Sequence, residues 1–200
     1  MTAQVFTKTY EDFPFNDREI LRYAGCTTGE ELTSLLAEAK SLVKNAFVYK
    51  VCFARLPVQT EGGRVALNGV LLPSNDLKKA LKGCKEVLLM AATVGVGIDR
   101  LVLKYQQISP SKAVFLQAIG AERIETLCNA FCKDFEREEG VLLRPRFSPG
   151  YGDLPLEIQN LVFQWLSPEK SIGLTLGDSL LMSPTKSVTA FVGIEGSGTR

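Results

Sequence analysis

Residues 47–58, FVYKVCFARLPV, combine β-branched and aromatic residues in the manner of a β-strand. The turn sequence Glu-Gly-Gly follows at 61–63, and a second apolar segment, RVALNGVLL, returns over 64–72. Two such segments on either side of a glycine turn predict a β-hairpin, whose strands pair antiparallel. Further along, EVLLMAATVG at 86–95 is apolar on both faces of a strand, which predicts a strand buried inside the sheet.

Helical segments surround these strands and are predicted from caps, apolar periodicity and glycine stops. Asn16 is the predicted N-cap of a helix over 17–23, which Gly25 ends, and the capping box Thr28–Glu31 begins a helix that runs to about Lys44. Ser74 or Asn75 caps a short helix over 76–82. The other predicted helices cover 98–105, the segment from after Pro110 to about 139, and 156–166. Short strands are predicted over 3–9, 172–176 and 186–194. This irregular alternation favours a mixed α+β fold over a doubly wound parallel sheet.

The longest predicted helix starts after Pro110 and runs to about Glu139, where Gly140 ends it. Its main apolar stripe contains Leu116, Ile124, Leu127, Phe131 and Phe135. A second stripe, about a third of a turn away, contains mostly small residues and one carboxylate: Val114, Ala118, Ala121, Glu125, Cys128 and Cys132. Small side chains let another group approach closely, so this second face is a candidate contact surface.

Composition excludes several classes of function. The chain has 200 residues, 46% of them hydrophobic, a net charge of +1 and no histidine. Without histidine, His-based acid–base catalysis, Ser-His and Cys-His nucleophiles and His-containing zinc sites are excluded. The near-neutral charge argues against nucleic-acid binding. With no long linker or repeat, we expect a single domain over 1–200, with an N-terminal part at 1–110, a motif-bearing part at 111–194 and a flexible tail at 195–200.

Cysteine usage and the absence of targeting patterns indicate a cytoplasmic protein. The five cysteines are odd in number and form no CxxC pattern, which suits buried thiols in a reducing compartment. Cys128 and Cys132 share a helix face but make an incomplete metal site, so no metal is expected. The N-terminus does not resemble a signal peptide, and the apolar run 87–98 is too short to span a bilayer.

The loop Arg146–Tyr151 is the strongest candidate for a binding site. Arg146 offers a guanidinium fork for a carboxylate, and Tyr151 offers a ring face for a purine or a cation. Pro149 fixes the backbone, and Gly150 permits close approach of a ligand. The alternative is a well-built surface turn in which Arg146 bonds to backbone.

Two further positions each allow a functional interpretation and a simpler one. Glu125 could hold an ammonium group, or could be an exposed residue that pairs with Lys133 or Arg123 within the helix. Gly95-Val96-Gly97 stands between a strand and a helix, where backbone amides can bind an anion. Because the third glycine of a dinucleotide fingerprint is missing, simple turn geometry is favoured there.

Two segments resemble the activation domain of cobalamin-dependent methionine synthase: RFSPGYGDLP and IGLTLGDSLLMSPTKSVTAFVGI. The family's RxxxGY loop is matched by Arg146, Gly150 and Tyr151. Its later segment is matched by Thr175-Leu176, Asp178, Pro184 and Ser187-Val188. The resemblance extends over most of the chain. It includes AERIETLCNAF in the long helix, and NDREILRYAG and MAATVGVGIDR further upstream resemble stand-alone members of the family.

The resemblance implies a curved, twisted, mainly antiparallel sheet flanked by helices, and a site for S-adenosylmethionine. It implies that Arg146 holds the methionine carboxylate, that Ser148, Pro149 and Gly150 lie against the ligand, that Tyr151 packs near it and that Glu125 faces its amino group. The implied role is that of a methionine synthase reactivation subunit without catalytic residues of its own. It supports reductive methylation of cob(II)alamin on a cobalamin-binding methionine synthase or related corrinoid protein, with a flavodoxin-like or ferredoxin-like electron donor.

Two departures from the family pattern keep an alternative open. The family has an acidic residue six positions before the motif arginine, where this chain has Gly140 beside Glu139. The family chain also continues beyond the Ser-Val strand and supplies another aromatic contact. The alternative is therefore a non-catalytic docking module for a corrinoid protein that has lost S-adenosylmethionine binding. A methyltransferase for another substrate ranks lower, because no glycine-rich methyltransferase loop is evident.

Overall fold

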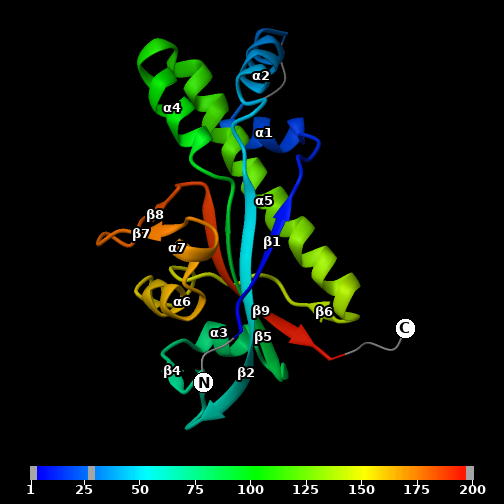
Figure 1. Cartoon of the computed structure of the whole chain (residues 1–200), viewed down its shortest axis with the longest axis vertical. Helices are drawn as coiled ribbons and strands as arrows, with labels where there is room; N and C mark the ends of the chain where they lie inside the picture. The colour runs from blue at the N-terminus through cyan, green and yellow to red at the C-terminus, as the bar shows by residue number, and fades with distance from the viewer. Residues whose placement is uncertain (1–3, 27–29, 197–200) are drawn as a thin grey trace.

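The computed structural model describes residues 4–26 and 30–196, and its centre is an open antiparallel sheet (Figure 1). Seven strands form this sheet in the order β4-β3-β2-β5-β9-β6, with β1 also paired to β2. A separate two-stranded sheet contains β7 and β8. The strands are β1 (Phe6–Tyr10), β2 (Tyr49–Glu61), β3 (Arg64–Leu67), β4 (Val70–Leu72), β5 (Glu86–Thr93), β6 (Leu142–Leu143), β7 (Thr175–Leu176), β8 (Met182–Ser183) and β9 (Ser187–Glu195). Every pairing is antiparallel, which confirms the expected α+β class and sheet type.

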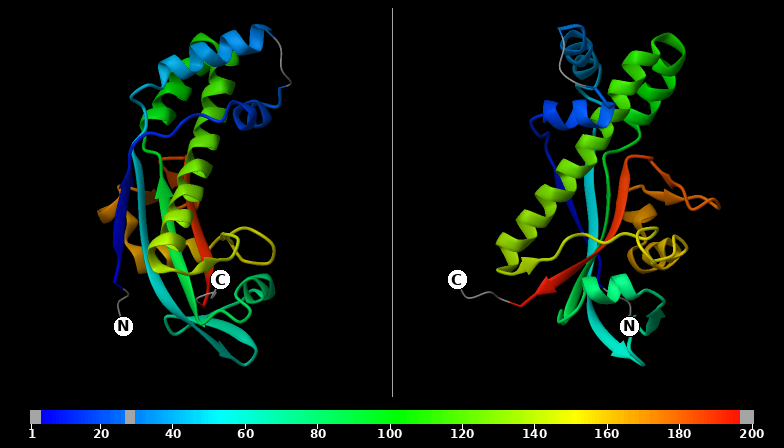
Figure 2. Two further views of the ribbon diagram at one scale, coloured as in Figure 1. Left: turned by 90° about the vertical axis from the view of Figure 1, so that its right-hand side faces the viewer. Right: turned by 180° about the vertical axis from the view of Figure 1, so that it is seen from behind.

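Helices cover both faces of the sheet. They are α1 (Asp17–Ala24), α2 (Glu30–Leu42), α3 (Asn75–Ala80), α4 (Gly97–Ile108), α5 (Pro110–Glu139), α6 (Ile158–Leu166) and α7 (Pro168–Ser171). Figure 2 shows the long helix α5 lying along one face. The helices α1, α2 and α4 belong to the same core cluster as α5, whereas α3 and α6 pack against the opposite face.

The period of two along the central strands explains this two-sided burial. In β5, Leu88, Met90 and Ala92 contribute to the core on the α5 side, and the alternate residues contribute to the core on the α6 side. A strand covered on both faces must be apolar at nearly every position, which is why β5 was identifiable as a buried strand.

Local signals set most helix boundaries. The Asn16 side chain accepts a hydrogen bond from the Glu19 amide at 3.3 Å, and Gly25 ends α1 in the left-handed region. Gly140 ends α5 in the same way, at φ +65°. Thr28 of the expected capping box lies outside the described residues, as do residues 197–200 of the expected tail.

Two expectations about the strands need correction. The return segment 64–72 is not one strand, because Asn68 and Gly69 both have positive φ and form a second tight turn between β3 and β4. The last strand, β9, extends through Glu195, the residue at which the flexible tail was expected to begin. The short elements α7, β6 and β8 were not predicted, and β8 lies where a turn was expected over 178–184.

The long helix buries its main stripe as expected: Leu116, Ile124, Leu127, Phe131 and Phe135 are each at most 6% exposed. The second stripe is mixed, since Ala118 and Cys128 are buried whereas Val114 is 48% exposed. This face therefore lies only partly against the rest of the molecule.

A buried ion pair fixes the N-terminal segment to α5. The side chains of Arg123 and Glu122 are 0% and 2% exposed, and they are 2.6 Å apart. Arg123 also donates hydrogen bonds to the carbonyl oxygens of Phe13 and Pro14, at 2.7 and 2.8 Å. Its guanidinium lies over the ring of Phe15, 4.4 Å from the centroid.

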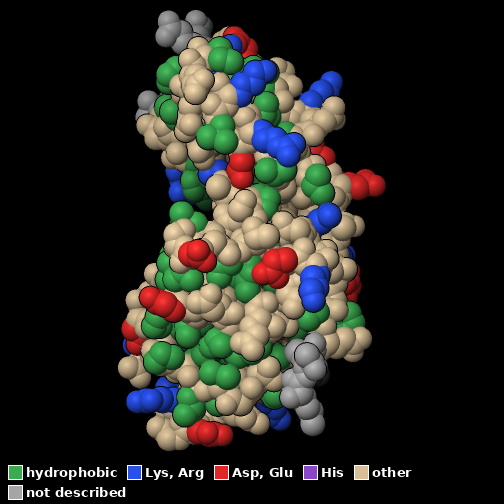
Figure 3. Space-filling model, turned by 60° about the vertical axis from the view of Figure 1, so that its left-hand side comes forward, with side chains coloured by type: hydrophobic (Ala, Val, Ile, Leu, Met, Phe, Trp, Pro, Cys, Tyr) green, Lys and Arg blue, Asp and Glu red, His purple; other side chains and the backbone are tan. Residues whose placement is uncertain are grey.

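Acidic and basic side chains are interspersed with hydrophobic ones on the face drawn in Figure 3. Within residues 4–26 and 30–196, no helix is long and apolar enough to cross a membrane.

Candidate functional site

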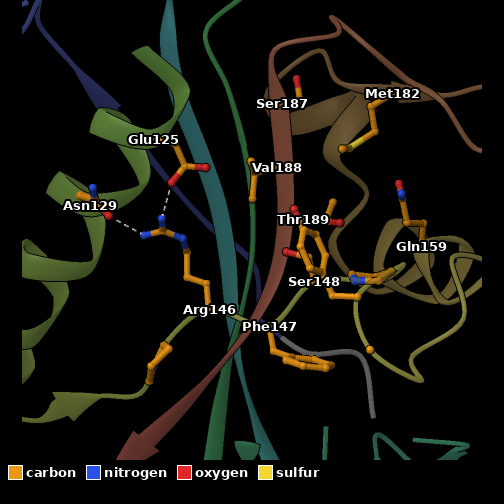
Figure 4. A pocket seen from close by; sticks show the side chains of 14 residues that line it. Glu125, Asn129, Arg146, Phe147, Ser148, Gln159, Met182, Ser187, Val188 and Thr189 are labelled. Carbon is orange, nitrogen blue, oxygen red and sulfur yellow. Dashed lines mark hydrogen bonds and ion pairs between the residues drawn. The ribbon is translucent and has the colours of Figure 1, made fainter. Parts of the chain in front are cut away.

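A cavity of about 770 Å³ lies beside the outer edge of β9, between α5 and α6 (Figure 4). This volume is within the range of small-molecule sites. The strand β6 pairs only with the far end of β9, so the residues at the start of β9 have no neighbouring strand on this side in the described chain. The cavity is lined by Glu125, Asn129, Pro145, Arg146, Phe147, Ser148, Pro149, Tyr151, Gly152, Gln159, Met182, Ser187, Val188 and Thr189.

An arginine and a glutamate from distant parts of the chain meet on the α5 side of the cavity. The Arg146 Nη2 atom is 2.6 Å from Glu125 Oε2, and Nη1 donates to Asn129 Oδ1 at 2.8 Å. Glu125 therefore pairs with Arg146 of the loop before α6, and not along α5 with Lys133 or Arg123. Both partners remain partly accessible, with side-chain exposures of 21% for Arg146 and 42% for Glu125. A ligand can therefore reach either charge.

The loop that carries Arg146 is a tight turn held at its start by the sheet. Phe147 forms a two-way backbone bridge with Phe191 of β9, and the Tyr151 amide donates to the Ser148 carbonyl at 3.2 Å. Gly150 has φ +87°, and a Cβ atom there would lie 3.2 Å from the Leu156 side chain. Glycine is therefore needed for the shape of this turn.

Five of the six predicted site residues line the cavity: Glu125, Arg146, Ser148, Pro149 and Tyr151. Gly150 is not among the lining residues and shapes the loop behind them. Tyr151 stands at the rim with 69% of its surface exposed, so its ring is available to cover a bound molecule.

Asp153 fixes the other end of this loop, a role that sequence reasoning missed. Its carboxylate accepts hydrogen bonds from the Ser74 hydroxyl and from the amides of Asn75 and Asp76, at 2.8 and 3.1 Å for the amides. These groups begin α3, so Asp153 stabilises the N-terminus of that helix. The Ser74 hydroxyl, followed by the two amides, holds the pKa of the Asp153 carboxyl below its usual value.

Gln159 of α6 lines the opposite side of the cavity and was also missed. It is 6% exposed, and its Oε1 atom has no hydrogen-bond partner among the described residues. In sequence it appears only as a polar residue in an apolar helix, so the signal was weak. Met182 and Thr189 lie near it in Figure 4, on the side of β9 away from α5.

The two cysteines near Arg146 are ordinary buried thiols. Burial raises the pKa of Cys128 to about 12, although the Arg146 guanidinium acts in the opposite direction. Burial also raises the pKa of Cys132. Thiolates are the form that binds metals and attacks electrophiles, so neither side chain is poised for such chemistry. In the part of the chain that the structure describes, no group of three or more metal-ligating residues is found.

The Gly95–Gly97 turn is explained by packing. Gly95 has φ +82°, and a Cβ atom on Gly97 would lie 2.2 Å from the Ala46 carbonyl oxygen. This close approach of two backbone segments excludes any other residue at Gly97, which supports the turn-geometry interpretation.

The fold and cleft define a class: an α+β domain with an open antiparallel sheet and a ligand-sized cavity at one sheet edge. No protein-family model and no curated protein matches the sequence. Among solved structures, the chain is similar to the MetH reactivation domain bound to AdoHcy, with a TM-score of 0.68 and 13% sequence identity. The match covers 99% of this chain and 80% of that one. The chain therefore has the fold of the MetH reactivation domain, as the resemblance implied.

Proposed function

We propose that this protein is a reactivation subunit that binds S-adenosylmethionine in the cavity beside β9. The observation that carries the proposal is the convergence of Glu125 and Arg146, 21 positions apart in sequence, on one ligand-sized cavity at 2.6 Å from each other. The likeness to a domain bound to AdoHcy supports the same assignment, since AdoHcy differs from S-adenosylmethionine by one methyl group.

The residues present fit such a ligand. A zwitterionic amino acid carries a carboxylate and an ammonium, and the cavity offers one guanidinium and one carboxylate. On binding, Arg146 would exchange Glu125 for the ligand carboxylate, and Glu125 would take the ammonium. The exposed ring of Tyr151 suits the sulfonium cation or the purine.

In this role the protein acts on a partner. When bound, S-adenosylmethionine would supply the methyl group, and a flavodoxin-like or ferredoxin-like donor would supply the one electron that cob(II)alamin needs before methylation. The cobalamin would be carried by a methionine synthase or another corrinoid protein. This chain would hold the methyl donor and present it, which is consistent with a cavity that opens beside an exposed aromatic residue.

Isothermal titration calorimetry with S-adenosylmethionine tests the proposal. Arg146→Ala should weaken binding by about 1.5–3 kcal/mol, because a charge-assisted contact to the carboxylate is lost. Arg137→Ala is the matched control, since Arg137 lies on α5 with its side chain 72% exposed. It should bind like the wild type. Absence of binding by the wild type would overturn the proposal.

One observation favours the second candidate, a docking module without its own ligand. Gly140 ends α5 at φ +65°, and the neighbouring Glu139 pairs with Arg55 at 2.8 Å. Neither residue supplies the acidic contact that the family has at this position. Co-purification with a cobalamin-loaded corrinoid protein, unaffected by Arg146→Ala and without binding of S-adenosylmethionine, would favour this second candidate.

A further inference from the structure

A second cavity lies between α2 and α4, at the end of the molecule where Figure 1 shows both helices. Its volume is about 450 Å³, which is within the range of small-molecule sites. The end of α2 and the segment after it form one wall, and the first turns of α4 form the other. Among the described residues, none lines both this cavity and the one beside β9.

Three cations line the second cavity without a counterion. They are Lys44, which follows α2, and Arg100 and Lys104 on α4. All three side chains are exposed. Within residues 4–26 and 30–196, none of them forms an ion pair, and no acidic residue lines the cavity. The cavity therefore has a concentrated positive charge.

Other cations on or against α2 do have carboxylate partners. Lys40, one turn before Lys44, lies 2.6 Å from Asp17, and Lys112 at the start of α5 lies 2.7 Å from Glu38. Carboxylates therefore neutralise the cations around the cavity but not those that line it.

The two cations on α4 also repel each other. Arg100 and Lys104 are four residues apart, so their side chains lie on the same face of the helix. Like charges at this spacing destabilise a helix, and Lys44 adds a third charge from the opposite wall. An anion bound between the walls would turn this repulsion into attraction.

The deeper part of the cavity is apolar. Leu42, Ala46 and Leu101 line it, are half-buried and pack against the same core as α5. A ligand that complements the cavity therefore has an anionic group for the exposed cations and an apolar group for the half-buried residues.

We propose that the cavity between α2 and α4 binds a small organic phosphate. The planar fork of donors on Arg100 matches phosphate oxygens, and the ammonium groups of Lys44 and Lys104 add point charges. A phosphate monoester carries nearly two negative charges at neutral pH, so three cations around one small cavity suit it. The carboxylates of an acidic peptide are instead spaced along its backbone. The site makes no use of the S-adenosylmethionine assigned to the other cavity, so the two proposals can fail separately.

Phenyl phosphate, inorganic phosphate and phenol are the probes, because together they separate the anionic part of a ligand from the apolar part. In heteronuclear NMR titrations at pH 7.5 and low salt, phenyl phosphate should bind with a dissociation constant below about 2 mM. The backbone amides that shift should be those of 41–46 and 97–104. Inorganic phosphate should bind at least about threefold more weakly, because it buries no apolar surface. Phenol, which is uncharged at this pH, should leave these amides unshifted.

Arg100→Gln combined with Lys104→Gln should weaken binding of phenyl phosphate at least about fivefold, because both charges of the α4 wall are removed. Lys44→Gln should also weaken it, which tests the opposite wall. The matched control combines Arg18→Gln with Lys133→Gln, since these two cations are exposed and line neither cavity. The control removes the same charge and should bind like the wild type. Without ligand, the Arg100 and Lys104 double variant should melt at or above the wild-type temperature, because it relieves repulsion on α4.

Three results would overturn the site: no amide shifts at about 10 mM phenyl phosphate, shifts confined to the cavity of Glu125 and Arg146, or equal weakening in the matched control. Binding of a polyglutamate peptide at 41–46 and 97–104, without binding of phenyl phosphate, would also overturn it in favour of an acidic protein segment. Unchanged binding of phenyl phosphate at saturating S-adenosylmethionine would support it. Binding of phenyl phosphate by a chain that does not bind S-adenosylmethionine would retain this site and reject the proposed function.

Discussion

Replacing Arg123 by methionine should destabilise the protein by about 3–4 kcal/mol. The substitution leaves the Glu122 carboxylate, 2% exposed, without its ion-pair partner. Breaking a buried pair on one side costs about 3–5 kcal/mol, because the remaining charge stays desolvated. The Thr126 hydroxyl still donates to Glu122 at 2.7 Å, which places the expected loss in the lower part of that range. The freed carbonyls of Phe13 and Pro14 are only partly buried and can bind water.

Urea-induced equilibrium unfolding at neutral pH, followed by circular dichroism, measures the effect. The double variant Glu122→Met with Arg123→Met should recover at least half of the lost stability, since apolar replacement of both partners removes the unpaired charge. Arg137→Met is the control, and it should change the free energy of unfolding by no more than about 0.5 kcal/mol. A loss below about 1 kcal/mol for Arg123→Met, or no recovery in the double variant, would refute the reasoning.

Two further predictions concern the site loop and the thiols. Asp153→Asn should lower the melting temperature at pH 7 and weaken ligand binding, because the carboxylate anchors the loop to α3 through the Ser74 hydroxyl and two amides. The folded-state pKa of Asp153 is depressed below its ordinary 3.8. The stability that the carboxylate contributes is therefore present above pH 3.8 and is lost as the pH falls through the folded-state pKa. A difference in melting temperature between wild type and variant that stays constant from pH 7 to pH 3 would contradict this. In alkylation by iodoacetamide at pH 8, Cys128 should stay unmodified until the protein unfolds, since burial raises its pKa to about 12, while the half-buried Cys26 reacts first. Mass spectrometry of peptides checks the order, and early modification of Cys128 would be inconsistent with the buried site.

Features that depend on neighbouring residues were predictable from sequence. The Asn16 cap, the Gly140 stop and the apolar stripe of α5 were all identified and are all observed. Each depends on residues within one or two helical turns, so the local sequence contains the whole signal. The resemblance carried by Arg146–Tyr151 and the later segment gave the fold, which the likeness to the MetH reactivation domain confirms.

The arrangement of the side chains in the site was harder to predict from the sequence. Glu125 was expected to have either an exposed position, an intrahelical partner or a ligand, and its observed partner is Arg146. That pairing requires β9 to lie beside β5, and the loop before α6 to bridge to β9 at Phe191. Asp153 and Gln159 acquire their importance only from groups that are distant in sequence, namely the start of α3 and the cavity beside β9.

The sequence by itself thus determined the helices other than α7, the buried central strand, the first hairpin and the loop that carries Arg146. Caps, glycine stops and apolar periods act over a few residues, and their energies do not depend on the rest of the fold. Only the tertiary structure decided that Glu125 faces Arg146, that Asp153 anchors the loop and that Gln159 is buried without a partner. These outcomes follow from strand order and register, which are set by the packing of the whole chain.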